Sequence, residues 1–359
     1  MINMVNYLDS RRIAGTTAER SSVPIPATSG GWVELGRTTL GSAGDSIDVT
    51  SLADKRYLMV LDYSLASSTI DSYTQINGDT GSNYAQRRSI DGGADTTNTS
   101  LPYQDAVFSS GVAVPHFGVR YIANRSSNEK LTVGHYVRQN TAGAGNVPNR
   151  TEIVSKWANT SNAINRINTQ NSSGGSFNTG SEVVVLGWDE SDTHTTNFWE
   201  ELADVTLSSA GDTINSGTFT AKKYIWVQGY LKNSGNLDNC RIYLGNTSID
   251  TGSNYAFRHA TNGASDGTNG SMQGAWFTVT NVAESVFVNM FIVNNASNEK
   301  LIISHANYDG GAGAANAPQR TEMVGKWANT SNQFNKIQLY NGGTGDFDTG
   351  SFIKVWGSH

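Results

Sequence analysis

The sequence predicts an all-β protein: two tandem jelly-roll-like β-sandwich domains preceded by an extended N-terminal arm. Three observations lead to this prediction. Apolar residues come in short runs separated by Gly, Asn and Asp, which is typical of strands joined by tight turns. No segment shows a sustained 3.6-residue periodicity. Most of the sequence also occurs twice, which indicates a duplicated domain.

Composition excludes several classes of protein. The 359 residues include 8 Trp, 14 Tyr and 12 Phe, too many aromatics for a disordered chain. The net charge of −6 argues against general nucleic-acid binding. Cys240 is the single cysteine, so an intrachain disulfide framework and a cysteine zinc site are excluded. No apolar run approaches the length of a membrane helix, and residues 1–12 lack the apolar stretch of a signal peptide.

The repeats define the domain boundaries. The segment Arg150–Asn162 recurs as Arg320–Asn332 with 11 of 13 positions identical, and shorter matches recur at offsets of 167 to 171 residues. A period of this length describes a whole domain rather than a solenoid repeat. We therefore expect copy one at residues 32–192, a polar linker at 189–197 and copy two at residues 199–359. Residues 1–31 have no counterpart before copy two, and their polar, Pro-containing sequence predicts an arm that docks on its own domain or on a neighbouring subunit.

Within each copy, runs rich in aromatic and branched residues predict the strands. In copy two these runs are Tyr224–Leu231, Val286–Val293, Leu301–Ile303 and Phe352–Trp356, and in copy one Tyr57–Leu61, Val119–Ala123, Leu131–Val137 and Val183–Trp188. Roughly eight to ten strands per copy fit a two-sheet sandwich. The segment Thr151–Ala158 fits a short helix and a strand equally well.

Two equivalent histidines and two equivalent glutamates could carry chemistry. His135 and His305 alternate with apolar neighbours. A metal ligand or general base is conceivable, but no second His or Cys is near either in its own copy, so a hydrogen-bonded core histidine is favoured. A glycosidase would need two close carboxylates. Glu152 and Glu322 each follow Arg-Thr, and an ion pair that holds a loop explains them more simply.

Two further motifs each have a functional and a structural interpretation. Trp157 and Trp327 lie in Lys-Trp-Ala-Asn-Thr-Ser-Asn segments with Asn159 and Asn329. These four residues could contact a glycan by ring stacking, yet a Trp that plugs the end of the sandwich is favoured. The Asp-Thr-Gly-Ser-Asn loops at residues 79–83 and 250–254 could bind calcium, but an Asx-type turn is favoured. We expect no catalytic residues, no metal and no cofactor.

The run Gly31–Leu40, followed by Gly44-Asp45, resembles repeated domains in predicted structural proteins of marine viruses, chiefly tailed phages. The turn Gly81–Tyr84, the two Lys-Trp-Ala-Asn-Thr-Ser-Asn segments and the closing Gly-Ser strand of each copy are similar to the same family. The start of the arm, with Leu8, Arg11, Arg12 and Ile13, is similar to their leading segments. The resemblance implies a virion component without catalytic residues, and arm residues that dock on a partner.

These observations favour a non-enzymatic virion protein, a capsid-decorating or fibre protein displayed on the particle surface by its arm. We expect it to be made in the host cytoplasm and to bind other virion proteins and further copies of itself, as a trimer. A double jelly-roll capsid subunit is a variant of this hypothesis. The alternatives are a carbohydrate-binding or adhesin module that recognises a host-surface glycan, an extracellular filament subunit joined by arm exchange, and a glycan-cleaving enzyme. Neither nucleic-acid binding nor membrane insertion is expected.

Overall fold

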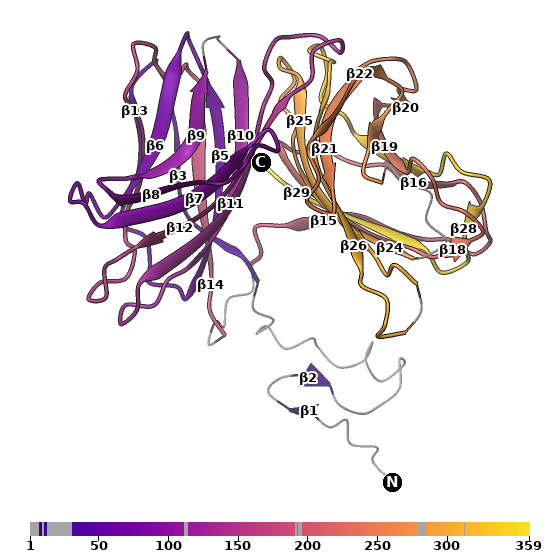
Figure 1. Cartoon of the computed structure of the whole chain (residues 1–359), viewed down its shortest axis with the longest axis horizontal. Coiled ribbons are helices and arrows are strands. Elements are labelled where there is room, and N and C mark those ends of the chain that lie inside the picture. Colours follow the sequence, from indigo (N-terminus) through magenta and orange to yellow (C-terminus); the bar gives the residue numbers. More distant parts are fainter. Residues whose placement is uncertain are drawn as a thin grey trace.

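The computed structural model describes residues 7–8, 11–12, 31–110, 114–190, 192, 196–278, 285–311 and 313–359. These residues form strands and turns but no helix, which confirms the all-β prediction. Accordingly, none of them belongs to a helix able to span a membrane. Figure 1 shows two β-sandwich units, copy one in indigo to magenta and copy two in orange to yellow.

Copy one is a sandwich of an eight-stranded and a four-stranded antiparallel sheet, in the orders β3-β14-β5-β10-β11-β12-β7-β8 and β4-β13-β6-β9. The strands of the larger sheet are β3 (Val33–Thr39), β5 (Tyr57–Leu65), β7 (Tyr84–Ile90), β8 (Thr96–Leu101), β10 (Pro115–Ala123), β11 (Lys130–Arg138), β12 (Asn149–Trp157) and β14 (Glu182–Trp188). The strands of the smaller sheet are β4 (Ser46–Val49), β6 (Ile70–Ile76), β9 (Gln104–Ser110) and β13 (Ile167–Asn171).

Copy two repeats this topology, with the orders β15-β29-β17-β24-β25-β26-β21-β22 and β16-β27-β19-β20. Its larger sheet contains β15 (Glu200–Thr206), β17 (Tyr224–Leu231), β21 (Tyr255–Thr261), β22 (Gly267–Met272), β24 (Val286–Val293), β25 (Lys300–Tyr308), β26 (Gln319–Trp327) and β29 (Phe352–Ser358). The strands of its smaller sheet are β16 (Thr213–Thr218), β19 (Arg241–Asn246), β20 (Ser248–Ile249), β23 (Ala275–Trp276) and β27 (Lys336–Tyr340). A separate two-stranded sheet contains β18 (Asn233–Ser234) and β28 (Asp346–Phe347).

Each sandwich has its own apolar core between its two sheets. In copy one the core includes Ile47, Val60 and Trp157, and in copy two it includes Ile214, Val227 and Trp327. The segment that fitted helix or strand equally well lies almost entirely in β12. There buried Ile153 and Ser155 alternate with exposed Val154, as expected for a strand with one face against the core.

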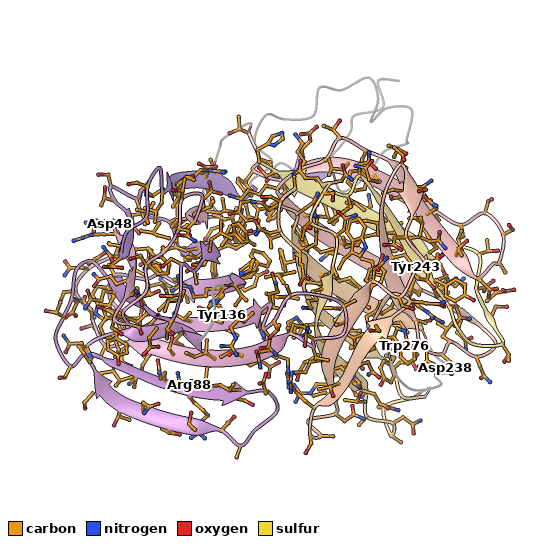
Figure 2. The ribbon with its side chains drawn as sticks, turned by 90° about the horizontal axis from the view of Figure 1, so that it is seen from above. Asp48, Arg88, Tyr136, Asp238, Tyr243 and Trp276 are labelled. Carbon is orange, nitrogen blue, oxygen red and sulfur yellow. The ribbon has the colours of Figure 1, made fainter. Side chains whose placement is uncertain are left out.

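A third apolar cluster joins the two copies. It contains residues from the outer faces of both eight-stranded sheets, among them Leu61, Phe117 and Val137 of copy one with Phe291 and Ile303 of copy two. Figure 2 shows side chains filling the space between the ribbons of copy one and those of copy two. The chain is therefore two sandwiches packed face against face, with a buried interface between them.

This interface uses the two copies unequally. In copy two, Tyr224, Leu301, Ile303 and Val324 are at most 4% exposed, because copy one covers them. The equivalent residues of copy one are Tyr57, Leu131, Val133 and Val154, which are 40%, 58%, 39% and 51% exposed. An apolar face that is buried in one copy is thus open in the other.

The described part of the arm is a pair of two-residue strands, β1 (Tyr7–Leu8) and β2 (Arg11–Arg12). Leu8 pairs with Arg11 and Tyr7 with Arg12, in a sheet separate from both sandwiches. Ile13, the remaining residue expected to dock, lies outside the described residues.

Candidate functional site

The two tryptophans considered for glycan stacking are buried. Trp157 is 1% and Trp327 is 2% exposed, and their rings stack on Tyr84 and Tyr255. Because both rings are packed in the sandwich cores, neither offers a face to a sugar. The stacking hypothesis is therefore wrong for these rings, and the structural interpretation describes them.

Each of these rings is held by the neighbouring Asp loop. The Trp157 indole N–H donates to Asp79 over 2.7 Å, and that of Trp327 donates to Asp250 over 2.8 Å. The Asp79 carboxylate also accepts from the backbone N–H of Gly81 and from the Asn83 amide. Burial acts to raise the pKa of Asp79, but these hydrogen bonds outweigh it and lower the pKa. The loops are the Asx-type turns that the sequence favoured.

The two asparagines assigned to glycan contact shape the loop after each Trp. The side-chain oxygen of Asn159 accepts from the N–H groups of Ser161 and Asn162. Asn329 makes the same two contacts in copy two. Asn329 and Trp327 both line a polar hollow of ≈ 450 Å³, together with Asn246, Asp250 and Asn332. Two members of the predicted set therefore border a space for a ligand, although the Trp327 ring itself is almost fully buried.

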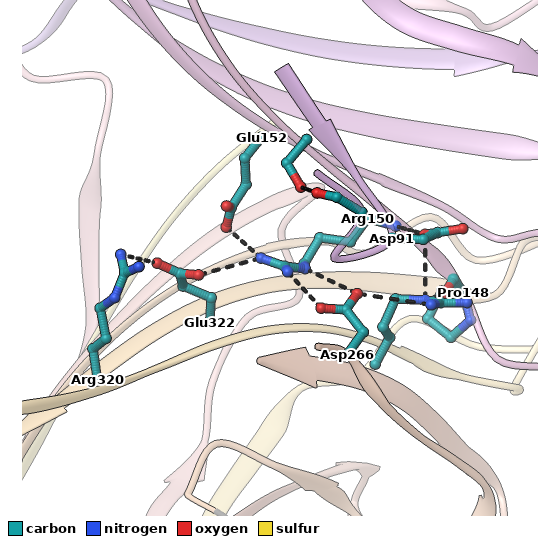
Figure 3. Close-up of polar contacts among 10 residues, drawn as sticks. Asp91, Pro148, Arg150, Glu152, Asp266, Arg320 and Glu322 are labelled. Atoms are coloured by element: carbon teal, nitrogen blue, oxygen red, sulfur yellow. Dashed lines mark hydrogen bonds and ion pairs between the residues drawn. The ribbon is translucent and has the colours of Figure 1, made fainter. Parts of the chain in front are cut away.

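The Arg-Thr-Glu motifs meet at the interface between the copies (Figure 3). Arg150 pairs with Glu152 of its own strand at 2.5 Å, and reaches across to Asp266 at 2.5 Å and Glu322 at 3.3 Å. Burial alone would lower the pKa of Arg150, but the three carboxylates raise it. The expected ion pair exists, and it joins two domains rather than holding one loop.

The two histidines meet at the same interface. The ring centroids of His135 and His305 are 4.2 Å apart. Burial lowers the pKa of His135 to about 4 and that of His305 to about 3, so both imidazoles are neutral at pH 7. In the part of the chain that the structure describes, no second His is near either one within its own copy, as the sequence indicated, but the other copy supplies the neighbour. The favoured interpretation of a hydrogen-bonded core histidine is wrong for His135, whose ring contacts the other copy and whose Nδ1 atom has no hydrogen-bond partner among the described residues.

The space beside these histidines is small. A cavity of ≈ 10 Å³ is lined by His135, Glu152, His305 and Glu322, among others. Such a volume admits about one water molecule or ion and cannot admit a sugar ring. Glu152 and Glu322 both contact Arg150, so two carboxylates are close together, but the groove that a glycosidase requires is not there.

A second interfacial ion pair shows how the two copies differ. Lys326 and Glu299 are 2.9 Å apart with side chains 0% and 3% exposed, whereas the equivalent Lys156 and Glu129 are 2.8 Å apart and 44% and 40% exposed. The Lys326 ammonium also donates to the backbone oxygens of copy one at Thr141, over 2.6 Å, and Gln139, over 3.3 Å. The same residue pair is thus a surface contact in copy one and an interdomain contact in copy two.

A large hollow lies on copy one, over the open apolar face. It is a groove of ≈ 810 Å³ whose walls include Trp32, Tyr57, Leu131, Val133, Val154 and Trp188. Tyr57 and Trp188 stack with centroids 5.3 Å apart. The sequence predicted the strands that carry Tyr57, Leu131, Val133 and Trp188, but not this site. Outward-facing apolar residues in alternation can equally be covered by another domain, as they are in copy two.

Comparisons with known proteins give the following picture. No family model and no curated protein matches this chain. Among solved structures, the chain is similar to domains LG4-5 of the mouse laminin α1 chain, with 11% identity, 91% of each chain covered and a TM-score of 0.21. It is also similar to the LG1-3 region of the laminin α2 chain, with 8% identity, 87% of this chain and 64% of that chain covered and a TM-score of 0.21. Likenesses at these scores carry no argument about function.

Proposed function

We propose that the chain is a non-enzymatic structural protein of a virus particle, a capsid-decorating or fibre protein that assembles through its N-terminal arm. The observation that carries the proposal is the open apolar groove on copy one. Exposed apolar side chains that lie together on one surface are typical of interaction sites. The sequence resemblance to virion structural proteins supports the same assignment.

The groove on copy one has apolar residues at the same positions as a surface that is covered in copy two. Its residues Leu131, Val133 and Val154 correspond to Leu301, Ile303 and Val324, which are buried beneath copy one. Covering the groove in the same way would remove its apolar side chains from water, at about 25 cal/mol per Å² of apolar area. A second molecule that fills the groove therefore has a clear energetic reason to bind.

The occupant that we propose is the arm of a neighbouring copy of the chain. Residues 1–31 precede Trp32, which lines one wall of the groove, so the arm leaves the body beside this surface. An extended segment can place alternate side chains in an apolar groove. Arm exchange between neighbours would link copies of the chain on a particle, and many linked copies would bind the particle with high avidity.

The first experiment measures the mass of the purified full-length chain in solution beside a chain that lacks residues 1–31. We expect a trimer or larger assembly for the full chain and monomers for the truncated one. The variant Val133→Asp, in the groove, should also give monomers. Phe287→Asp is the matched control, because Phe287 is 40% exposed on copy two and Val133 is 39% exposed, and it should assemble normally. A monomeric full-length chain overturns the proposed assembly.

The location on a virus particle has its own test. Antibodies raised against the folded chain should label the surface of purified particles in electron micrographs. Label that stays absent from intact particles would remove the virion assignment and leave the assembly mechanism standing.

A carbohydrate-binding function is the second candidate, and the polar hollow of copy two favours it. Asn246, Asp250, Asn329 and Asn332 surround this hollow and offer the amide and carboxylate groups that hydrogen-bond sugar hydroxyls. A glycan screen of the full-length chain tests this candidate, with Asn332→Ala expected to abolish any binding that occurs there. A screen without hits would reject it.

A further inference from the structure

We propose that the interface between the two copies is a binding site for a divalent transition-metal ion of the zinc type, held by His135, His305 and Glu152. A ligand atom from each of the three residues lies within 4.8 Å of the others. The inference is independent of the proposed virion function, because it rests on the contacts between the two sandwiches alone.

Strand pairing brings the ligands together. In copy one, His135 on β11 lies directly opposite Glu152 on β12, and in copy two His305 on β25 lies directly opposite Glu322 on β26. Both pairs are on the outer faces of their sheets, where the copies meet. Each copy thus supplies one imidazole and one carboxylate to the same point, an arrangement that follows from the duplication.

Two of the three ligand residues, His135 and Glu152, have an atom available for an ion. The Nδ1 atom of His135 is buried and has no hydrogen-bond partner among the described residues. Glu152 uses Oε1 to accept from Arg150, which leaves its second oxygen for a cation. A buried polar atom without a partner destabilises the folded chain, and a bound ion would supply the missing contact.

The types of these three ligands favour zinc and similar divalent transition metals. Two imidazoles with a carboxylate suit Zn²⁺, Co²⁺ or Ni²⁺ better than Ca²⁺ or Mg²⁺, which prefer oxygen ligands only. Ligands about 2.0–2.2 Å from a tetrahedral zinc ion lie roughly 3.3 Å from one another. Small side-chain rotations therefore have to draw the three atoms together. The neighbouring cavity of ≈ 10 Å³ has room for the ion, and Glu322 or a water molecule would be the fourth ligand.

The nearby arginine does not exclude a cation. Arg150 makes two contacts with Asp266, through Nη2 at 2.5 Å and Nε at 3.4 Å. These contacts lie on the side of the guanidinium away from the Nη1 atom that reaches Glu152 and Glu322. Arg150 therefore keeps a buried carboxylate partner when a metal takes up the free oxygen of Glu152. A bound ion would connect β11 and β12 of copy one to β25 of copy two.

Calorimetric titration of the metal-free full-length chain with zinc chloride tests the proposal. We expect one zinc ion per chain and a higher thermal midpoint when zinc is bound. His135→Gln, His305→Gln and Glu152→Gln should each weaken zinc binding by more than the roughly 10–100-fold that the loss of an outer-shell partner causes, since each removes a direct ligand. His359→Gln is the matched control, because His359 is exposed at the chain end, and it should bind zinc like the unaltered chain.

Two results would overturn the proposal: the unaltered chain takes up no zinc, or His305→Gln binds zinc as tightly as the unaltered chain. Circular dichroism of each metal-free variant shows whether it is folded. Should the histidine variants fail to fold, the near-isosteric Glu152→Gln carries the comparison. The visible spectrum of the Co²⁺-loaded unaltered chain is then a further test, since weak bands of octahedral, hydrated Co²⁺ would contradict a site built from two imidazoles.

Discussion

Replacement of Lys326 by Met should destabilise the chain far more than the same replacement of Lys156. Lys326 and Glu299 are buried at the interface between the copies, with side chains 0% and 3% exposed. Met keeps the apolar stem but leaves the Glu299 carboxylate buried without its cation, which costs about 3–5 kcal/mol. Lys156 and Glu129 are 44% and 40% exposed, and an exposed pair contributes about 0–1 kcal/mol.

The expected difference between the two variants is therefore about 3 kcal/mol, or roughly 6–12 °C in the thermal midpoint for a domain of this size. Urea unfolding followed by tryptophan fluorescence measures it, because Trp199 belongs to the interfacial cluster. The double variant Lys326→Met, Glu299→Leu should recover part of the loss, since it removes the unpaired charge as well. Equal losses in Lys326→Met and Lys156→Met, within about 0.5 kcal/mol, would refute the assignment of this pair to a buried interface.

Two further predictions concern groups buried within the sandwiches. Burial lowers the pKa of His116 to about 3, below the ordinary value of about 6.5. Between these two pH values His116 binds a proton in the unfolded chain but not in the folded chain. The free energy of unfolding should therefore fall as the pH drops from about 6.5 toward 3. His116→Leu should flatten this dependence in acid unfolding curves, and an unchanged slope would contradict the prediction. Asp79→Ala and Asp250→Ala leave the indole N–H groups of Trp157 and Trp327 without their acceptors. Each should lower the unfolding free energy by about 1–3 kcal/mol, and thermal denaturation showing no loss in either variant would show that these hydrogen bonds contribute nothing.

Much of the fold could be predicted because each strand carries a local signal. The runs Tyr224–Leu231 and Val286–Val293 coincide with β17 and β24, since branched and aromatic residues bounded by turn residues leave little alternative. Where the local pattern was ambiguous, at Thr151–Ala158, pairing with β11 and β7 makes the segment a strand. The described residues contain more strands than the eight to ten expected in each copy. In copy one, β8 is polar and almost wholly exposed, and in copy two, β20 and β23 have two residues each, so these strands carry almost no apolar pattern.

The candidate sites depended on contacts between distant residues, which one sequence does not show. His135 and His305 are 170 positions apart, and their meeting follows from how the sandwiches pack, not from either copy. The segments that hold Lys156 and Lys326 are nearly identical in sequence, yet one lysine is exposed and the other buried. The burial of Trp157 was the simpler interpretation of its sequence, and it proved to be the right one.

The pairing of the first and last strands of each sandwich has a consequence for biosynthesis. β3 pairs with β14, and β15 pairs with β29, so neither sheet is complete until the end of its own copy has left the ribosome. Contacts of such long sequence separation form slowly. The segments of β12 and β26 are nearly identical in sequence, so each could pair with the neighbours of the other. Because copy one is complete before β26 is made, synthesis from the N-terminus gives each strand its own partners first. Refolding of the whole chain from denaturant lacks this order, because both copies are present from the start. Strands of the two copies can then exchange, and the chain misfolds.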